Sequence, residues 1–72
     1  MAKRLINNAK LKEELSKQGV GVAKMAEITG LSRSLCSLVL SGKRPVTTNT
    51  LDVILKEFPA ITLENILNNE YK

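Results

Sequence analysis

Apolar side chains recur every three or four positions along most of this chain, the spacing that places them on one face of a helix. Glycines and prolines separate five such segments, the last of them with a weaker pattern, and none shows the sustained alternation of a β-strand. We expect helices over residues 8–18, 22–29, 33–41, 47–58 and 62–67. The pattern therefore predicts an all-α, five-helix fold.

Residues that begin and end helices stand at the predicted boundaries. Hydroxyl side chains that can accept a hydrogen bond from an early backbone N–H precede the later helices: Ser32, Thr47 or Thr48, and Thr62. Glycines that can end a helix follow the first three: Gly19, Gly30 and Gly42. Pro59 prevents the fourth helix from continuing.

The second and third predicted helices are separated only by Gly30, Leu31 and Ser32. Two short helices joined by such a turn, here over residues 22–41, match the helix-turn-helix unit, and we expect the second helix to enter a DNA groove.

The helix predicted over 33–41 has two chemically different arcs, since successive residues are about 100° apart around a helix. One arc is polar: Arg33, Ser34, Ser37 and Ser41. The opposite arc is apolar: Leu35, Cys36, Leu38, Val39 and Leu40. Short hydroxyls and one guanidinium can enter a major groove and offer hydrogen bonds to base edges, and the alternative is an ordinary solvated face.

Length and charge narrow the class of protein. The 72 residues, 43% of them hydrophobic, suffice for one small domain over 1–72 of marginal stability. The net charge of +4 is unevenly distributed, because nine basic and three acidic residues precede Pro45 and the remainder carries −2. A polyanion is therefore expected to bind the first part of the chain.

Residues 22–45, VAKMAEITGLSRSLCSLVLSGKRP, resemble the DNA-binding domains of the phage repressor and Cro family, also called lambda repressor-like, and the resemblance extends over most of the chain. It implies that Ala26 and Gly30 serve the turn. Three side chains would belong to the core: Met25, Cys36 and Val39. The segments 47–58 and 62–67 resemble the family's fourth and fifth helices.

The resemblance also implies which residues contact double-stranded DNA. Base contacts would come from Arg33, Ser34 and Ser37, with Leu38 either contacting a thymine methyl or packing. Contacts to the DNA backbone would come from Lys24, Ser32, Lys43, Arg44, Thr48 and Asn49, aided by the dipole of the fourth helix. Val22 stands where many relatives have glutamine, which removes one phosphate contact at the start of the second helix.

Three further features have alternative interpretations. Cys36 is expected to be a buried structural thiol rather than a redox sensor. Lys3 and Arg4 either form an arm along the DNA or are simply solvated. A group of apolar residues near the C-terminus either packs in the core or forms a dimer patch: Ile61, Leu63, Ile66, Leu67 and Tyr71.

Other classes of function find little support in the sequence. It has no histidine and a single cysteine, so neither a His/Cys zinc site nor an internal disulfide can form. We see no nucleophile with an acid–base pair and no phosphate-binding glycine loop, and expect neither enzymatic activity nor a cofactor. No apolar stretch is long enough to span a bilayer, and a bacterial cytoplasmic location is expected.

The leading hypothesis is a phage- or bacterium-type transcriptional regulator that binds a palindromic operator as a weak homodimer. A second hypothesis is the N-terminal DNA-targeting module of a larger protein, such as a Mu-like transposition ATPase. A third is a protein-interaction module, since the helix over 33–41 carries more leucines than contact with DNA requires.

Overall fold

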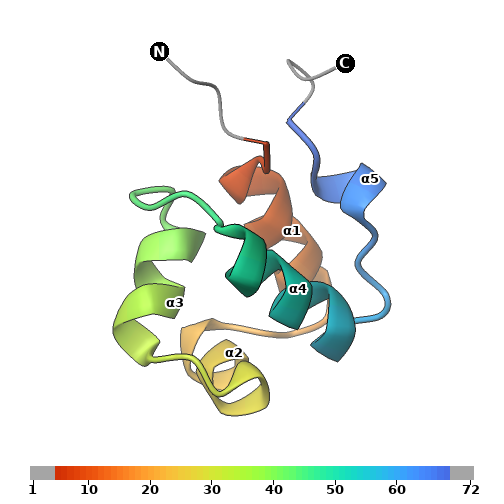
Figure 1. The fold of residues 1–72 in the computed structure, drawn as a ribbon. Coiled ribbons are helices and arrows are strands. Elements are labelled where there is room, and N and C mark those ends of the chain that lie inside the picture. The colour runs from red at the N-terminus through yellow and green to blue at the C-terminus, as the bar shows by residue number, and fades with distance from the viewer. Residues whose placement is uncertain (1–4, 69–72) are drawn as a thin grey trace.

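Five α-helices joined by short connections account for most of the computed structural model, which describes residues 5–68 (Figure 1). They are α1 (Asn8–Lys17), α2 (Val22–Thr29), α3 (Arg33–Leu40), α4 (Thr48–Glu57) and α5 (Leu63–Ile66). The all-α, five-helix prediction is confirmed, and each boundary lies within a residue or two of its expected place. Lys3, Arg4 and Tyr71, which were assigned possible contacts, lie outside the described residues.

Side-chain caps explain why three of the helices begin where they do. Asn7, Ser32 and Thr47 each accept a hydrogen bond from a backbone N–H in the first turn, over 3.1, 3.1 and 3.3 Å respectively. Such caps satisfy N–H groups that have no partner within the helix. Thr62 precedes α5 as predicted, but its side chain makes no capping hydrogen bond.

The connection between α2 and α3 depends on a glycine conformation. Gly30 has φ of 76°, in the left-handed region, and its N–H donates to the Ala26 carbonyl over 2.9 Å. A residue with a Cβ is strained in this conformation, whereas glycine adopts it freely. Gly30 therefore ends α2 and lets the chain enter α3 only three residues later.

The core lies between the helices, with contributions from each. α1 packs against α3 and α5, while α2 packs against α3 and α4. The buried apolar side chains form one cluster: Ile6, Leu11, Leu15, Val20, Met25, Cys36, Val39, Leu40, Leu51, Ile54, Phe58, Ile61 and Ile66. The expected burial of Met25, Cys36 and Val39 is confirmed, since all three are 0% exposed.

The two ends of the described chain meet in a short antiparallel bridge between Ile6 and Leu67. The Asn7 N–H donates to the Ile66 carbonyl and the Asn68 N–H to the Leu5 carbonyl, both over 2.8 Å. This pairing holds the segment before α1 beside the segment after α5, as the ribbon in Figure 1 shows.

The expected apolar patch near the C-terminus is largely part of the core. Ile61 is 3% exposed and Ile66 is 0% exposed, so neither is available to a second copy of the chain. Leu67 is half-buried, and among the described members of the group only Leu63 is exposed, at 40%. The two isoleucines therefore follow the first interpretation, core packing, and the dimer patch does not include them.

Candidate nucleic-acid interface

Helix α3 presents one polar face to solvent and one apolar face to the core. Cys36, Val39 and Leu40 are the buried residues of its apolar face. The polar residues predicted for the outer arc are exposed: Arg33, Ser34, Ser37 and Ser41. The outer face therefore consists mainly of hydroxyl groups together with one guanidinium.

Leu38 belongs to the apolar arc of this helix but is not buried. Its side chain is 36% exposed, next to the polar arc, and Leu35, between Leu38 and the buried residues around the helix, is half-buried. The reason is geometric, because the three buried residues span only about 100° of the helix circumference. A helix at the edge of so small a domain buries a narrow stripe, which leaves Leu38 available for an apolar contact.

Arg33 occupies the first position of α3, and that turn holds no acidic residue. The N-terminal end of a helix carries partial positive charge, so a cation there is unfavourable for helix stability by some tenths of a kcal/mol. Helix formation itself therefore does not explain an exposed arginine at this position. A negatively charged or hydrogen-bond-accepting partner would explain it.

The loop after α3 folds back on the end of that helix. Gly42 has φ of 82°, and the N–H groups of Lys43 and Arg44 both donate to the Leu38 carbonyl, over 3.0 and 3.2 Å. The side chains of Lys43 and Arg44 are exposed. Two cations thus follow α3 directly, on a backbone whose course is set by its own hydrogen bonds.

A buried side chain that the sequence did not single out supports this loop. The Asn8 Nδ2 donates to the Val39 carbonyl over 2.8 Å and to the Arg44 carbonyl over 2.9 Å. Asn8 is only 7% exposed, although it is the first residue of α1. An asparagine at the start of a helix ordinarily indicates a cap, and Asn7 is the cap of α1. That a second asparagine follows it was the only feature of the sequence that pointed to Asn8.

The remaining predicted contact residues also lie on the surface. Ser32, Lys24, Thr48 and Asn49 are all exposed. Ser32 uses its hydroxyl oxygen as the cap of α3, and its O–H remains a donor. The first turn of α4 contains no acidic residue, and Thr48 and Asn49 stand there. Within residues 5–68, every residue assigned a DNA contact is thus accessible to a partner.

The charge along this part of the chain has one sign. From Ile28 to Leu51 there is no acidic residue, while Arg33, Lys43 and Arg44 are basic. This stretch includes α3, the loop after it and the start of α4. A polyanion that contacts these elements meets no carboxylate from them.

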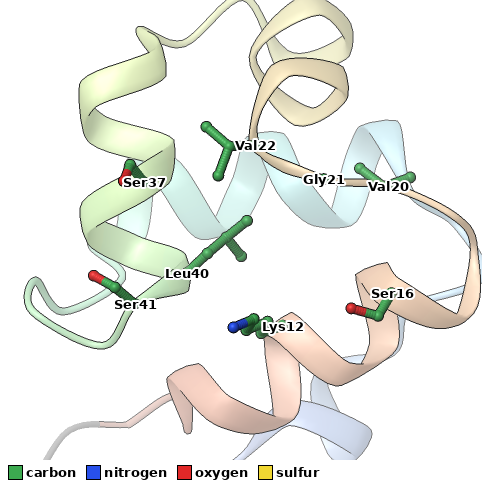
Figure 2. Close-up of a pocket in the computed structure, with 8 residues that line it drawn as sticks. All are labelled: Lys12, Ser16, Val20, Gly21, Val22, Ser37, Leu40 and Ser41. Carbon is green, nitrogen blue, oxygen red and sulfur yellow. The ribbon is translucent and has the colours of Figure 1, made fainter.

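A hollow of about 240 Å³ lies between α1, the connection to α2 and the end of α3. Figure 2 shows its lining, which is Lys12, Ser16, Val20, Gly21, Val22, Ser37, Leu40 and Ser41. Ser37 and Ser41 come from the outer face of α3, so the exposed side chain of Lys12 lies across the hollow from that face. Sequence reasoning did not select Lys12, because its proximity to α3 depends on tertiary packing.

Within residues 5–68, no helix has the length and apolar character needed to cross a membrane. In the same range no three His, Cys, Asp or Glu side chains are grouped so that they could hold a metal ion.

No family model, no curated protein and no solved structure matches this chain significantly. Membership of the repressor and Cro family consequently stays a prediction from residues 22–45.

Proposed function

We propose that this chain is a sequence-specific, double-stranded DNA-binding protein in which α2 and α3 form a helix-turn-helix. More particularly, we propose a phage- or bacterium-type transcriptional regulator of the repressor and Cro kind. The first statement rests on the surface of the molecule, and the second adds the resemblance of residues 22–45 to that family.

The observation that carries the proposal is the exposed face of α3. It offers Arg33 and three serines with no carboxylate, and the exposed Lys43–Arg44 pair follows directly. A major groove presents donors and acceptors that arginine and serine can bind, and a phosphate backbone attracts nearby cations. Each group therefore has a partner in duplex DNA, whereas a purely structural role accounts for neither.

In the proposed complex, α3 enters the major groove with its N-terminal residues toward the bases. Arg33 donates two hydrogen bonds to a guanine, Ser34 and Ser37 donate to or accept from neighbouring base edges, and Leu38 contacts a thymine methyl. Lys43 and Arg44 bind phosphates beside the groove, and Thr48 and Asn49 bind a further phosphate at the start of α4. The backbone contacts set the register in which α3 meets the bases.

The experiment that tests this function is selection of bound duplexes from a random library, followed by titration of the enriched duplex at several salt concentrations. We expect one enriched motif, with a binding constant whose logarithm falls by about 0.9 per phosphate contact for each logarithmic unit of salt. Absence of duplex binding at about 50 mM salt, where electrostatic attraction is strong, would contradict the proposal.

A protein-interaction surface is the second candidate, and the exposure of Leu38 favours it. Leu38→Ser distinguishes the two functions. If α3 binds DNA, this change leaves affinity for most sequences unaltered and weakens only the preference for a thymine. Absence of duplex binding by the native chain, together with loss of a protein partner in Leu38→Ser, would support the second candidate.

A further inference from the structure

The side-chain amide of Asn8 connects the start of α1 with the end of α3 and with the Lys43–Arg44 loop. Its nitrogen donates to the Val39 carbonyl, in the last turn of α3, and to the Arg44 carbonyl, in the loop that follows. These acceptors are 31 and 36 residues away along the chain. The Asn8 nitrogen thus binds one carbonyl of α3 and one carbonyl of the loop, and so fixes the position of the loop relative to the helix.

Among residues 42–45 the loop buries no side chain of its own. Lys43, Arg44 and Pro45 are exposed, and Gly42 has no side chain. At its start the loop is held by the two N–H groups that donate to the Leu38 carbonyl. At its end it is held by the bond from Asn8 to the Arg44 carbonyl.

We propose that Asn8 is a positioning residue for DNA binding: its amide holds the Lys43–Arg44 loop in the arrangement that contacts phosphate. This inference rests on the proposed function. A loop that is already ordered loses less conformational entropy when it binds than a loop that must order on the DNA. Asn8 does not touch DNA in this scheme, and its effect passes through the two cations that it places.

The chemistry of asparagine explains why this residue type suits the position. An amide NH₂ has two donor hydrogens on one nitrogen, which is what two neighbouring carbonyls require. Alanine would leave both carbonyls without this donor, and an aspartate carboxylate of the same shape would present oxygen to oxygen. Glutamine keeps both donors but is longer by one methylene, so it satisfies the carbonyls only if the loop moves outward.

The test compares three single variants of the full chain, each titrated with the selected duplex over a salt series after its melting temperature is measured. Asn7→Ala is the matched control. It removes the hydrogen bond from the Lys10 N–H that caps the same helix, and it does not alter the bonds to the loop. We expect Asn8→Ala and Asn8→Gln to bind every duplex about tenfold more weakly, with a salt slope lower by about one. Asn7→Ala should lower the melting temperature and leave the salt slope unchanged.

A double-mutant cycle separates positioning from general stability. Because Asn8 acts through Lys43 and Arg44, we expect Asn8→Gln to weaken binding no further once both cations are alanine. Asn8→Gln retains the amide donors, so it gives an answer even if Asn8→Ala does not fold.

Additive losses in this cycle, or a native salt slope in Asn8→Gln, would overturn the positioning role while the native chain still binds its duplex. If the native chain binds no duplex at low salt, the proposed function fails and this inference with it.

Discussion

Single residues of α3 differ sharply in what their surroundings allow. Arg33 is exposed at the N-terminal end of the helix, where its charge brings no benefit to the fold, whereas Cys36, three residues later, is 0% exposed. The former is free to contact a partner and the latter is confined to the core. Substitutions at these two positions should therefore affect different properties of the protein.

For Arg33→Ala we expect weaker binding together with relaxed base preference at one position of the site. An arginine that donates two hydrogen bonds to guanine contributes roughly 1–3 kcal/mol of discrimination, which is lost with the guanidinium. Competition titrations on duplexes that vary at single positions measure this effect. Arg33→Lys is the control, because it keeps the charge but not the paired donors, and it should retain affinity better than preference.

An equal loss of affinity for all duplexes, with preference intact, would instead make Arg33 a phosphate contact. The base contact assigned to it would then be wrong.

Cys36 should be inert toward thiol reagents while the protein is folded. Burial raises the pKa of the Cys36 thiol, and a hydrogen bond with the side chain of Thr29 opposes this rise only in part. Both the smaller thiolate fraction and the lack of access slow the reaction. A colorimetric disulfide reagent should react fully with the denatured chain. It should react with the native chain only as fast as the protein unfolds, and a rapid reaction of the native protein would contradict this prediction.

At the scale of elements, α2 and α3 with their three-residue turn form one unit, and the loop after α3 extends it. Gly30 and Ser32 define the turn, one by its left-handed backbone and the other by capping α3. The Lys43–Arg44 loop is linked to α3 through the Leu38 carbonyl. Contacts made by the helix and by the loop should therefore form together. Those of the helix should determine base preference, and those of the loop should raise affinity for all duplexes alike.

Lys43→Ala and Arg44→Ala should each weaken binding to all duplexes alike. Removal of one phosphate contact releases one fewer counterion, so each change lowers the salt slope by about one. Titrations of a specific and an unrelated duplex across a salt series measure both effects. Lys56→Ala is the matched control, because it removes a cation that is exposed near the end of α4, outside the interface.

Neither slope will change if the loop does not touch DNA. A slope that falls equally in Lys56→Ala would show that net charge, rather than the loop contact, is responsible.

At the scale of the whole molecule, the bridge between Ile6 and Leu67 brings the two ends of the described chain together. Burial of Ile61 and Ile66 in the core leaves few exposed apolar side chains in the described C-terminal part, chiefly Leu63. The expected dimer thus has a small apolar contact available. A small contact favours an association that DNA assembles more than free solution does.

We expect mostly monomer in sedimentation at micromolar concentration, and two protomers bound cooperatively on a palindromic duplex with half-sites about one DNA turn apart. Leu63→Ser should reduce the cooperativity and leave the affinity for a single half-site unchanged. Ala60→Ser is the control, since it makes a similar polar change at another exposed position. A palindromic duplex saturated by one protomer would rule out the dimer and favour the targeting module of a larger protein.

Features set by neighbours along the chain could be predicted from the sequence. The helices, their order and most of their ends depend on apolar spacing, on caps such as Ser32 and Thr47, and on Gly30, all of which act within a few residues. The exposure of Arg33, Ser34 and Ser37 on the outer arc of α3 followed from the same local pattern. One cysteine in an apolar arc was likewise enough to predict its burial.

Only the tertiary structure decided which residues meet across long separations. The Asn8 amide reaches Arg44, Lys12 lies across a hollow from Ser37, and Ile61 and Ile66 turn inward, because packing brings α1 against both α3 and α5. The exposure of Leu38 depends on how wide a stripe α3 buries, which its neighbours in space determine. Helical periodicity gives the direction of a side chain around its own helix, but not the position of the next helix.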